Sequence, residues 1–400
     1  MRFFSTALAL AVLAMPLAAQ DTTTTSVAVK EPLPWRTSYF PYFTVSPNDG
    51  LMGIARVLLF RQAEFGDRVT MRDAIAFEGG YSTSDAWFVR SRLDFPKLAD
   101  GWRLAAALET GKQPKFGWPE DPVARTRSDI WIDATRRVHG RLGFALRGGV
   151  DYQHVTGDAG ILYERYPLTY IEPVGCPPTF LCTNDSGYGV QQTDVNARAA
   201  LVLDLRDREF DTRSGALIEG GFFTGTGGGD QSYYGGYAIA RGWYSPRRGT
   251  RLTSRIGLQA VSKSDATGIL QEMPAWESPI TTFGGPNSHR GLGISQVSGR
   301  GRLLGGAELR HDLLNVGELG AITAVVFVDG GRVFSDSSPL VDPAPGAPVS
   351  SGDLQLTLKG WTVGGGGGIA IRVMRAAQLV VTAARGDGVT RWYVSTGWSW

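Results

Sequence analysis

Long segments of this chain alternate between apolar and polar residues with a period of two. Between 194 and 206 one face is entirely apolar and the other mostly polar, with Val195, Ala197, Ala199, Leu201, Leu203 and Leu205 opposing Asp194, Asn196, Arg198, Ala200, Val202, Asp204 and Arg206. Segments 87–95, 129–135 and 251–263 repeat the pattern. Successive side chains of a strand point to opposite faces, so this period indicates strands rather than helices. The sequence therefore predicts an all-β protein.

The predicted strands are long, and the connections between them are uneven. Many strands reach about 10 residues or more, against about 5 to 6 in soluble proteins. Tight turns at 245–249 and 315–318 contrast with long polar connections at 156–190, 264–302 and 334–359. This contrast is typical of an antiparallel transmembrane β-barrel, where every backbone group must pair within a closed sheet.

Sixteen strands are predicted, an even number that places both chain ends on the side of the short turns. Their expected ranges are 38–46, 51–62, 68–81, 84–96, 101–111, 125–136, 140–156, 192–206, 214–225, 231–245, 249–264, 303–312, 319–329, 359–374, 376–384 and 389–400. The 53 glycines, 11 tryptophans and 13 tyrosines fit a barrel with many turns and interfacial aromatic rings.

The N-terminus has the features of a secretory signal. Arg2 precedes an apolar run that ends in small residues, which predicts a signal peptide at 1–19. A buried N-terminal helix is the alternative. Residues 20–36 are predicted to be a short periplasmic lead-in, and 37–400 a single barrel in the outer membrane of a Gram-negative-type bacterium.

Charge and reactive residues exclude several function classes. The 40 basic and 38 acidic residues give a net charge of +2, which does not favour a nucleic-acid partner. Cys176 and Cys182 are close in sequence, which favours a local disulfide in an oxidising compartment over a metal site that would need two more ligands. The run Gly364–Gly368 lacks the Lys-Ser/Thr of a phosphate loop. We expect no catalytic residue, cofactor or bound metal.

The last predicted strand has aromatic rings on one face. Trp392, Trp398 and Trp400 share a face with Val394 and Thr396. Such a strand would place its rings at the membrane interface on the side of the chain ends. An ordinary edge strand that happens to end on Trp is the alternative.

The stretch 283–292, Phe-Gly-Gly-Pro-Asn-Ser-His-Arg-Gly-Leu, suits neither a helix nor a strand. The pair Gly284 and Gly285 predicts a sharp loop turn, and Arg290 needs a partner to reach. In the predicted strand 319–329, residues 322, 324, 326 and 328 form an apolar face suited to lipid, so Asp329 is expected to point inward.

Five stretches occur in a recognisable order. They are 46–50 (Ser-Pro-Asn-Asp-Gly), 203–207 (Leu-Asp-Leu-Arg-Asp) with Ser214-Gly215, 283–292, 307–310 (Ala-Glu-Leu-Arg) and 327–333 (Phe-Val-Asp-Gly-Gly-Arg-Val). Together they resemble the BamA/TamA-type bacterial surface antigen family, over nearly the whole chain after the signal.

The resemblance implies that the sixth long loop folds back into the barrel. The Arg290-Gly291 pair would then meet the strand that carries Phe327 and Asp329. The alternative is that Arg290 is a solvated loop cation and Asp329 a residue at a strand end. Four further charged residues are expected to line the lumen as a salt-bridge network: Asp204, Arg206, Glu308 and Arg310.

The resemblance also implies a function, because family members insert proteins into the outer membrane or export them across it. Only about fifteen residues separate the signal from the first strand, too few for the periplasmic POTRA domains of larger members. We therefore expect a monomeric barrel that contacts outer-membrane lipid and unfolded outer-membrane proteins, with a separate periplasmic partner chain as a further expectation. A passive pore is the main alternative and a barrel-embedded enzyme the third. A short or unpaired contact between the first and last strands would favour the first hypothesis.

Overall fold

In the computed structural model the chain forms two compact units, residues 1–34 and Trp35–Trp400. The second unit contains the barrel. The structure describes residues 33–46, 48–64, 67–69, 71–116, 123–157, 172–173, 188–209, 211–227, 232–262, 272–273, 280–281, 283–293, 301–317, 319–334, 361–373 and 377–396. Within these ranges, no helix is long and apolar enough to cross a membrane.

Long β-strands account for most of the described residues. They are β1 (Arg36–Ser46), β2 (Gly50–Gln62), β3 (Met71–Ser82), β4 (Trp87–Ala99), β5 (Trp102–Phe116), β6 (Val123–His139), β7 (Leu142–Gly157), β9 (Tyr188–Asp204), β10 (Gly215–Gly225), β11 (Tyr233–Arg247), β12 (Thr250–Val261), β15 (Gly301–Asn315), β16 (Gly320–Phe334), β17 (Thr362–Val373), β18 (Ala377–Gly386) and β19 (Val389–Thr396). Two-residue strands occur at β8 (Glu172–Pro173), β13 (Glu272–Met273) and β14 (Ile280–Thr281).

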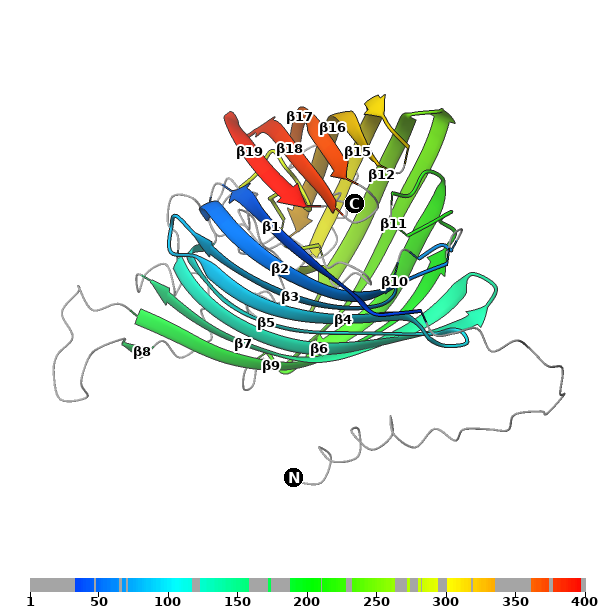
Figure 1. The fold of residues 1–400 in the computed structure, drawn as a ribbon. Helices are drawn as coiled ribbons and strands as arrows, with labels where there is room; N and C mark the ends of the chain where they lie inside the picture. The colour runs from blue at the N-terminus through cyan, green and yellow to red at the C-terminus, as the bar shows by residue number, and fades with distance from the viewer. Residues whose placement is uncertain are drawn as a thin grey trace, which may run out of the picture. The chain divides into compact units, whose positions relative to one another are not determined.

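The sixteen long strands form one closed antiparallel sheet. Each pairs with its neighbours in the sequence, and β1 pairs with both β2 and β19. In Figure 1 the strand colours follow the chain around the sheet from blue to red. The predicted fold class, a 16-stranded antiparallel barrel, is confirmed. The predicted strand 192–206 ends two residues earlier in the structure, so Arg206 lies beyond β9.

The two ends of the barrel differ in the length of their connections. We call the end that carries the start of β1 and the end of β19 the short-turn end, because it has tight connections such as 100–101, 140–141 and 248–249. The opposite, long-loop end has the connections 158–187, 262–300 and 335–361. Two longer connections, 63–70 and 205–214, also lie at the short-turn end.

The alternating sequence pattern separates an apolar outer face from a polar inner face. In β12 every second residue is buried, with Arg251, Thr253, Arg255 and Gln259 inside and Leu252, Ile256 and Leu258 exposed outside. A barrel that faces lipid requires this distribution, because hydrocarbon cannot solvate the charged side chains.

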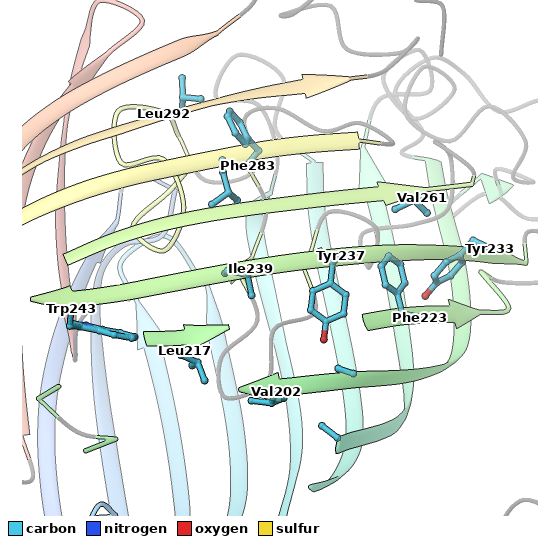
Figure 2. Close-up of a cluster of buried hydrophobic side chains, with 13 residues drawn as sticks. Val202, Leu217, Phe223, Tyr233, Tyr237, Ile239, Trp243, Val261, Phe283 and Leu292 are labelled. Carbon is cyan, nitrogen blue, oxygen red and sulfur yellow. The ribbon is translucent and has the colours of Figure 1, made fainter. Parts of the chain in front are cut away.

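One part of the inner wall is apolar instead. Figure 2 shows this cluster, which includes Phe223, Tyr233 and Tyr237 on β10 and β11. The ring of Phe223 lies 6.2 Å from that of Tyr233 and 6.3 Å from that of Tyr237, between centroids. Phe283 and Leu292, near the two ends of segment 283–293, belong to the same cluster and are buried. The inner wall therefore offers this segment an apolar base.

Candidate functional site

Segment 283–293, which we call the docked loop, begins with a glycine turn. Gly284 and Gly285 have φ of 118° and 100°, in the region where only glycine is unstrained. The backbone N–H of Gly285 donates to the carbonyl groups of His289 (3.2 Å) and Leu292 (3.1 Å). The N–H of Gly284 donates to the Ser288 hydroxyl at 2.9 Å. These bonds close the loop on itself and hold Arg290 near its tip.

Arg290 is bound on several sides by β15 and β16. Its Nε and Nη2 donate to the two carboxylate oxygens of Asp329 at 2.7 and 3.0 Å, and its backbone N–H adds a bond of 3.1 Å. Its Nη1 donates to Glu308 at 2.7 Å. The guanidinium carbon lies 3.4 Å from the centre of the Phe327 ring, within cation–π range. Arg290 and Asp329 are 2% and 0% exposed, so this pair lies away from water.

Glu308 extends the ion pair into a chain of charges. One of its carboxylate oxygens accepts from Arg290, and the other forms an ion pair with Arg310, two residues along β15. Glu308 and Arg310 are both buried. Because each acid touches at least one guanidinium, this burial leaves neither carboxylate of the site unpaired.

Side chains from two other strands hold the loop backbone. Arg255 on β12 donates to the carbonyl groups of Asn287 and Ser288, both at 2.6 Å. On β19, Arg391 donates to the carbonyl of Gly291 at 2.6 Å and Tyr393 donates to that of Leu292 at 2.8 Å. The docked loop therefore joins β12, β15, β16 and β19 through inward-facing side chains.

Glycines allow the loop backbone to lie directly on the strands. A Cβ added to Gly291 would stand 2.9 Å from the Cα of Gly364 on β17 and 3.0 Å from that of Gly386 on β18. The first distance is shorter than real Cβ contacts, and the second is tighter than most of them, so a side chain here would force strand backbone to move. His289, next to this contact, donates from Nε2 to the carbonyl of Thr362 at 3.2 Å. The Gly291 position is thus fixed by packing as well as by the carbonyl bond to Arg391.

The barrel closes between β1 and β19 at a contact that we call the seam, and within the described residues the paired part of this contact is short. Among the described residues, β1 and β19 are paired in register only at Val45 and Val394. By contrast, β1 and β2 are paired from Arg36 with Phe60 to Ser46 with Gly50. In the described part of the chain, most of the β1 edge that faces away from β2 therefore has no paired strand.

Comparison with known proteins places the fold in a family. The model of the Omp85 superfamily domain matches residues 101–398. The chain belongs to the Omp85 superfamily. BamA from Haemophilus ducreyi lacking POTRA domains 1–3 is similar in structure, with 14% sequence identity, a TM-score of 0.57, and coverage of 92% of this chain and 71% of that one.

CdiB from Escherichia coli is also similar, with 15% identity and a TM-score of 0.52 over 92% of this chain. This chain spans 63% of the CdiB chain. No curated protein sequence matches. As an Omp85 barrel, the protein lies in the Gram-negative outer membrane.

Asp204 and Arg206 belong to a different part of this Omp85 barrel from Glu308 and Arg310. Arg206 forms two bonds to Asp204, at 3.0 and 3.2 Å, and Arg68 in the 63–70 connection also pairs with Asp204 at 3.0 Å. Asp204 and Arg206 thus lie at the short-turn end, whereas Glu308 binds Arg290 of the docked loop and Arg310 of its own strand.

Two ion pairs anchor a segment of the chain that runs across the short-turn end of the barrel. Glu209 forms an ion pair with Arg103 of β5 at 2.9 Å, and Asp211 forms one with Arg251 of β12. The backbone N–H of Glu209 also donates to the carbonyl of Arg68 at 2.9 Å. Five long strands of the sheet separate β5 from β12, so the described residues of connection 205–214 reach across the short-turn end of the lumen. We call it the strap.

The predicted C-terminal tryptophans and the two cysteines lie largely outside the described residues. Trp392 is 61% exposed on the outer face of β19, whereas Trp398 and Trp400 lie outside the described residues. Cys176 and Cys182 also lie outside them, so their disulfide stays a prediction.

Sequence reasoning missed Arg255, Arg391, Tyr393, Gly364 and Gly386 as loop contacts. One signal was present for two of them, because Arg391 and Tyr393 occupy the face of the last strand opposite the tryptophans. That face points into the barrel, and a buried arginine there requires a partner.

Proposed function

We propose that this Omp85 barrel inserts outer-membrane proteins into the membrane or exports proteins across it, by presenting the edge of β1 to a client strand. The observation that carries the proposal is that, within the described residues, the seam is paired in register only at Val45 and Val394. An unpaired strand edge exposes N–H and C=O groups that hydrocarbon cannot satisfy, so the edge is a template for another strand. The clients would be unfolded outer-membrane proteins, whose strands can add to a sheet edge through main-chain hydrogen bonds.

The sequence of β1 supports an edge that stays open. Pro41 lies in the middle of an uninterrupted pairing with β2, opposite Ala55. Proline has no N–H, and within a sheet it is found where its nitrogen faces away from the paired strand. Pro41 therefore removes one donor from the seam side and weakens closure onto β19. Tyr39 and Phe43, on the outer face of the same strand, are 75% and 51% exposed.

The docked loop would supply the fixed side of the seam. It binds Arg391 and Tyr393 of β19, the strand that carries Val394, through two of its carbonyl groups. It also binds β12, β15 and β16, so β19 is held to the wall behind it. In this proposal β1 moves away from a stationary β19, and the protein acts without catalysing covalent chemistry.

Reconstitution into lipid vesicles tests the proposal. An unfolded client barrel is added from urea, and its folding is followed by the shift in gel mobility of unheated samples. Vesicles with the full chain should fold the client faster than protein-free vesicles of the same lipid. Equal rates with and without the protein would refute the proposal.

A passive pore is the second candidate, favoured by water-accessible charges on the inner wall. The side chains of Arg56 and Arg90 are 36% and 39% exposed, and that of Glu109 is 43% exposed. The strap, however, spans the short-turn end of the same lumen. A pore function predicts steady ion current in planar bilayers from the unaltered chain, together with no acceleration of client folding.

A further inference from the structure

The short-turn end carries a group of arginines on neighbouring strand ends and connections. We call it the arginine rim, and its members are Arg136, Arg137, Arg141, Arg213, Arg247 and Arg248. All are exposed except Arg213, which is half-buried. The connections that carry them touch one another: Arg141 donates to the carbonyl of Arg206 at 3.1 Å, and Ser245 donates to that of Arg213 at 2.8 Å.

The acids near the rim are engaged elsewhere. Asp204 pairs with Arg206 and Arg68, Glu209 with Arg103, and Asp211 and Asp312 with Arg251. Within the described ranges, none of the rim arginines forms an ion pair.

Two exposed carboxylates remain close by. Asp207 accepts backbone N–H bonds from Arg208 and Arg213, at 3.0 and 3.1 Å, and Asp100 lies in the turn between β4 and β5. Six arginines against these two acids leave the rim with a clear excess of positive charge, which attracts anions at short range.

Aromatic residues place the rim at the level of lipid headgroups. Arg136 is opposite Trp102 of β5 on one side and opposite Phe144 of β7 on the other. Its guanidinium carbon lies 5.3 Å from the centre of the Trp102 ring. Ile132, four residues earlier on the same outer face, is 56% exposed to the lipid side. Aromatic girdles of this kind mark the boundary between hydrocarbon and headgroups.

We propose that the arginine rim binds the phosphate groups of anionic phospholipids in the leaflet at the short-turn end. Guanidinium groups suit this ligand because they donate two parallel hydrogen bonds to a phosphate. Arg136 faces outward at headgroup depth, where a lipid phosphate is the anion that lies within reach. The binding does not depend on the seam, so it is independent of the proposed function.

Lipid titration followed by native mass spectrometry tests this proposal. The purified full chain in a neutral detergent at low salt is titrated with phosphatidylglycerol or phosphatidylcholine, and bound lipids are counted. The test variant is Arg137→Gln/Arg247→Gln/Arg248→Gln, because these three side chains make no recorded hydrogen bond in the structure. Each arginine near an anionic surface strengthens binding about fivefold, so the variant should lose about 100-fold of its phosphatidylglycerol affinity. Its phosphatidylcholine affinity should not change.

A matched control removes three cations from the same end of the barrel on other strands: Arg36→Gln/Arg72→Gln/Lys97→Gln. This control should keep the preference for phosphatidylglycerol, and a rim variant with lysine at the three positions should keep most of it. Heat-dependent gel mobility checks that each variant is folded.

Three results would overturn the proposal. They are equal binding of the two lipids by the unaltered chain, a preference that survives in the folded glutamine variant, and displacement of phosphatidylglycerol by inorganic phosphate at equal concentration. The last result would mark the rim as a site for free anions.

Discussion

Removal of the Arg290 side chain should destabilise the barrel strongly, because Asp329 would be left buried without its guanidinium partner. Arg290 supplies two side-chain bonds to Asp329 and one to Glu308, all between groups that are almost completely buried. Loss of one partner from a buried ion pair costs about 3–5 kcal/mol. Glu308 keeps Arg310, so most of the cost arises at Asp329. We expect Arg290→Ala and Asp329→Ala each to lower the free energy of unfolding by about this amount.

A double-mutant cycle separates the pair from the general loss of packing. Unfolding in urea is measured in lipid vesicles by gel mobility for the unaltered chain, the two single variants and the double variant. The double variant removes both charges, so it should be less destabilised than the sum of the single variants. We expect a coupling energy of about 2–3 kcal/mol. Coupling below about 0.5 kcal/mol would refute the pairing as a source of stability. Arg290→Lys should rescue only part of the loss, because lysine lacks the planar fork.

Three further predictions concern the docked loop. Gly291→Ala should destabilise the barrel by about 1–3 kcal/mol because the added methyl group meets strand backbone, while Gly53→Ala, which meets nothing within 4 Å, should have little effect in the same urea assay. Tyr393→Phe should cost about 1 kcal/mol, since it leaves the Leu292 carbonyl without this donor; an unchanged unfolding midpoint would contradict the bond. Burial lowers the pKa of His289, so the folded state keeps the ring neutral while the unfolded chain takes up a proton below about pH 6.5. The free energy of unfolding should therefore fall as the pH drops from 7 to 5, and it should fall less in His289→Gln.

The sequence predicts the barrel well because its signal is local and repeated. Alternation along 194–206 fixes both the strand and its inner face, since a shift of one residue would turn every apolar side chain inward. The same argument gives the inward direction of Asp329, and the structure brings Asp329 to Arg290.

Contacts between distant segments leave no such pattern. The sequence of the Gly364–Gly368 run predicts only a strand segment, yet Gly364 makes room for Gly291, which is 73 residues away in the sequence. Asp204 and Glu308 are both inward acids, but Asp204 pairs with Arg206 and Glu308 with Arg290. Which inward acids share a guanidinium depends on the register of separate strands and on the path of the strap, and neither is encoded near those residues.

The most direct measurement of the central claim is client folding by a barrel whose seam is locked. Val45 and Val394 are paired Cα partners, and antiparallel pairs lie about 4.5–5.5 Å apart, within the range of a disulfide. Val45→Cys/Val394→Cys is made in a chain where Cys176 and Cys182 are replaced by serine, which also serves as the control. The account predicts that the oxidised protein loses its acceleration of client folding and regains it on reduction. Full acceleration with the seam locked would contradict it.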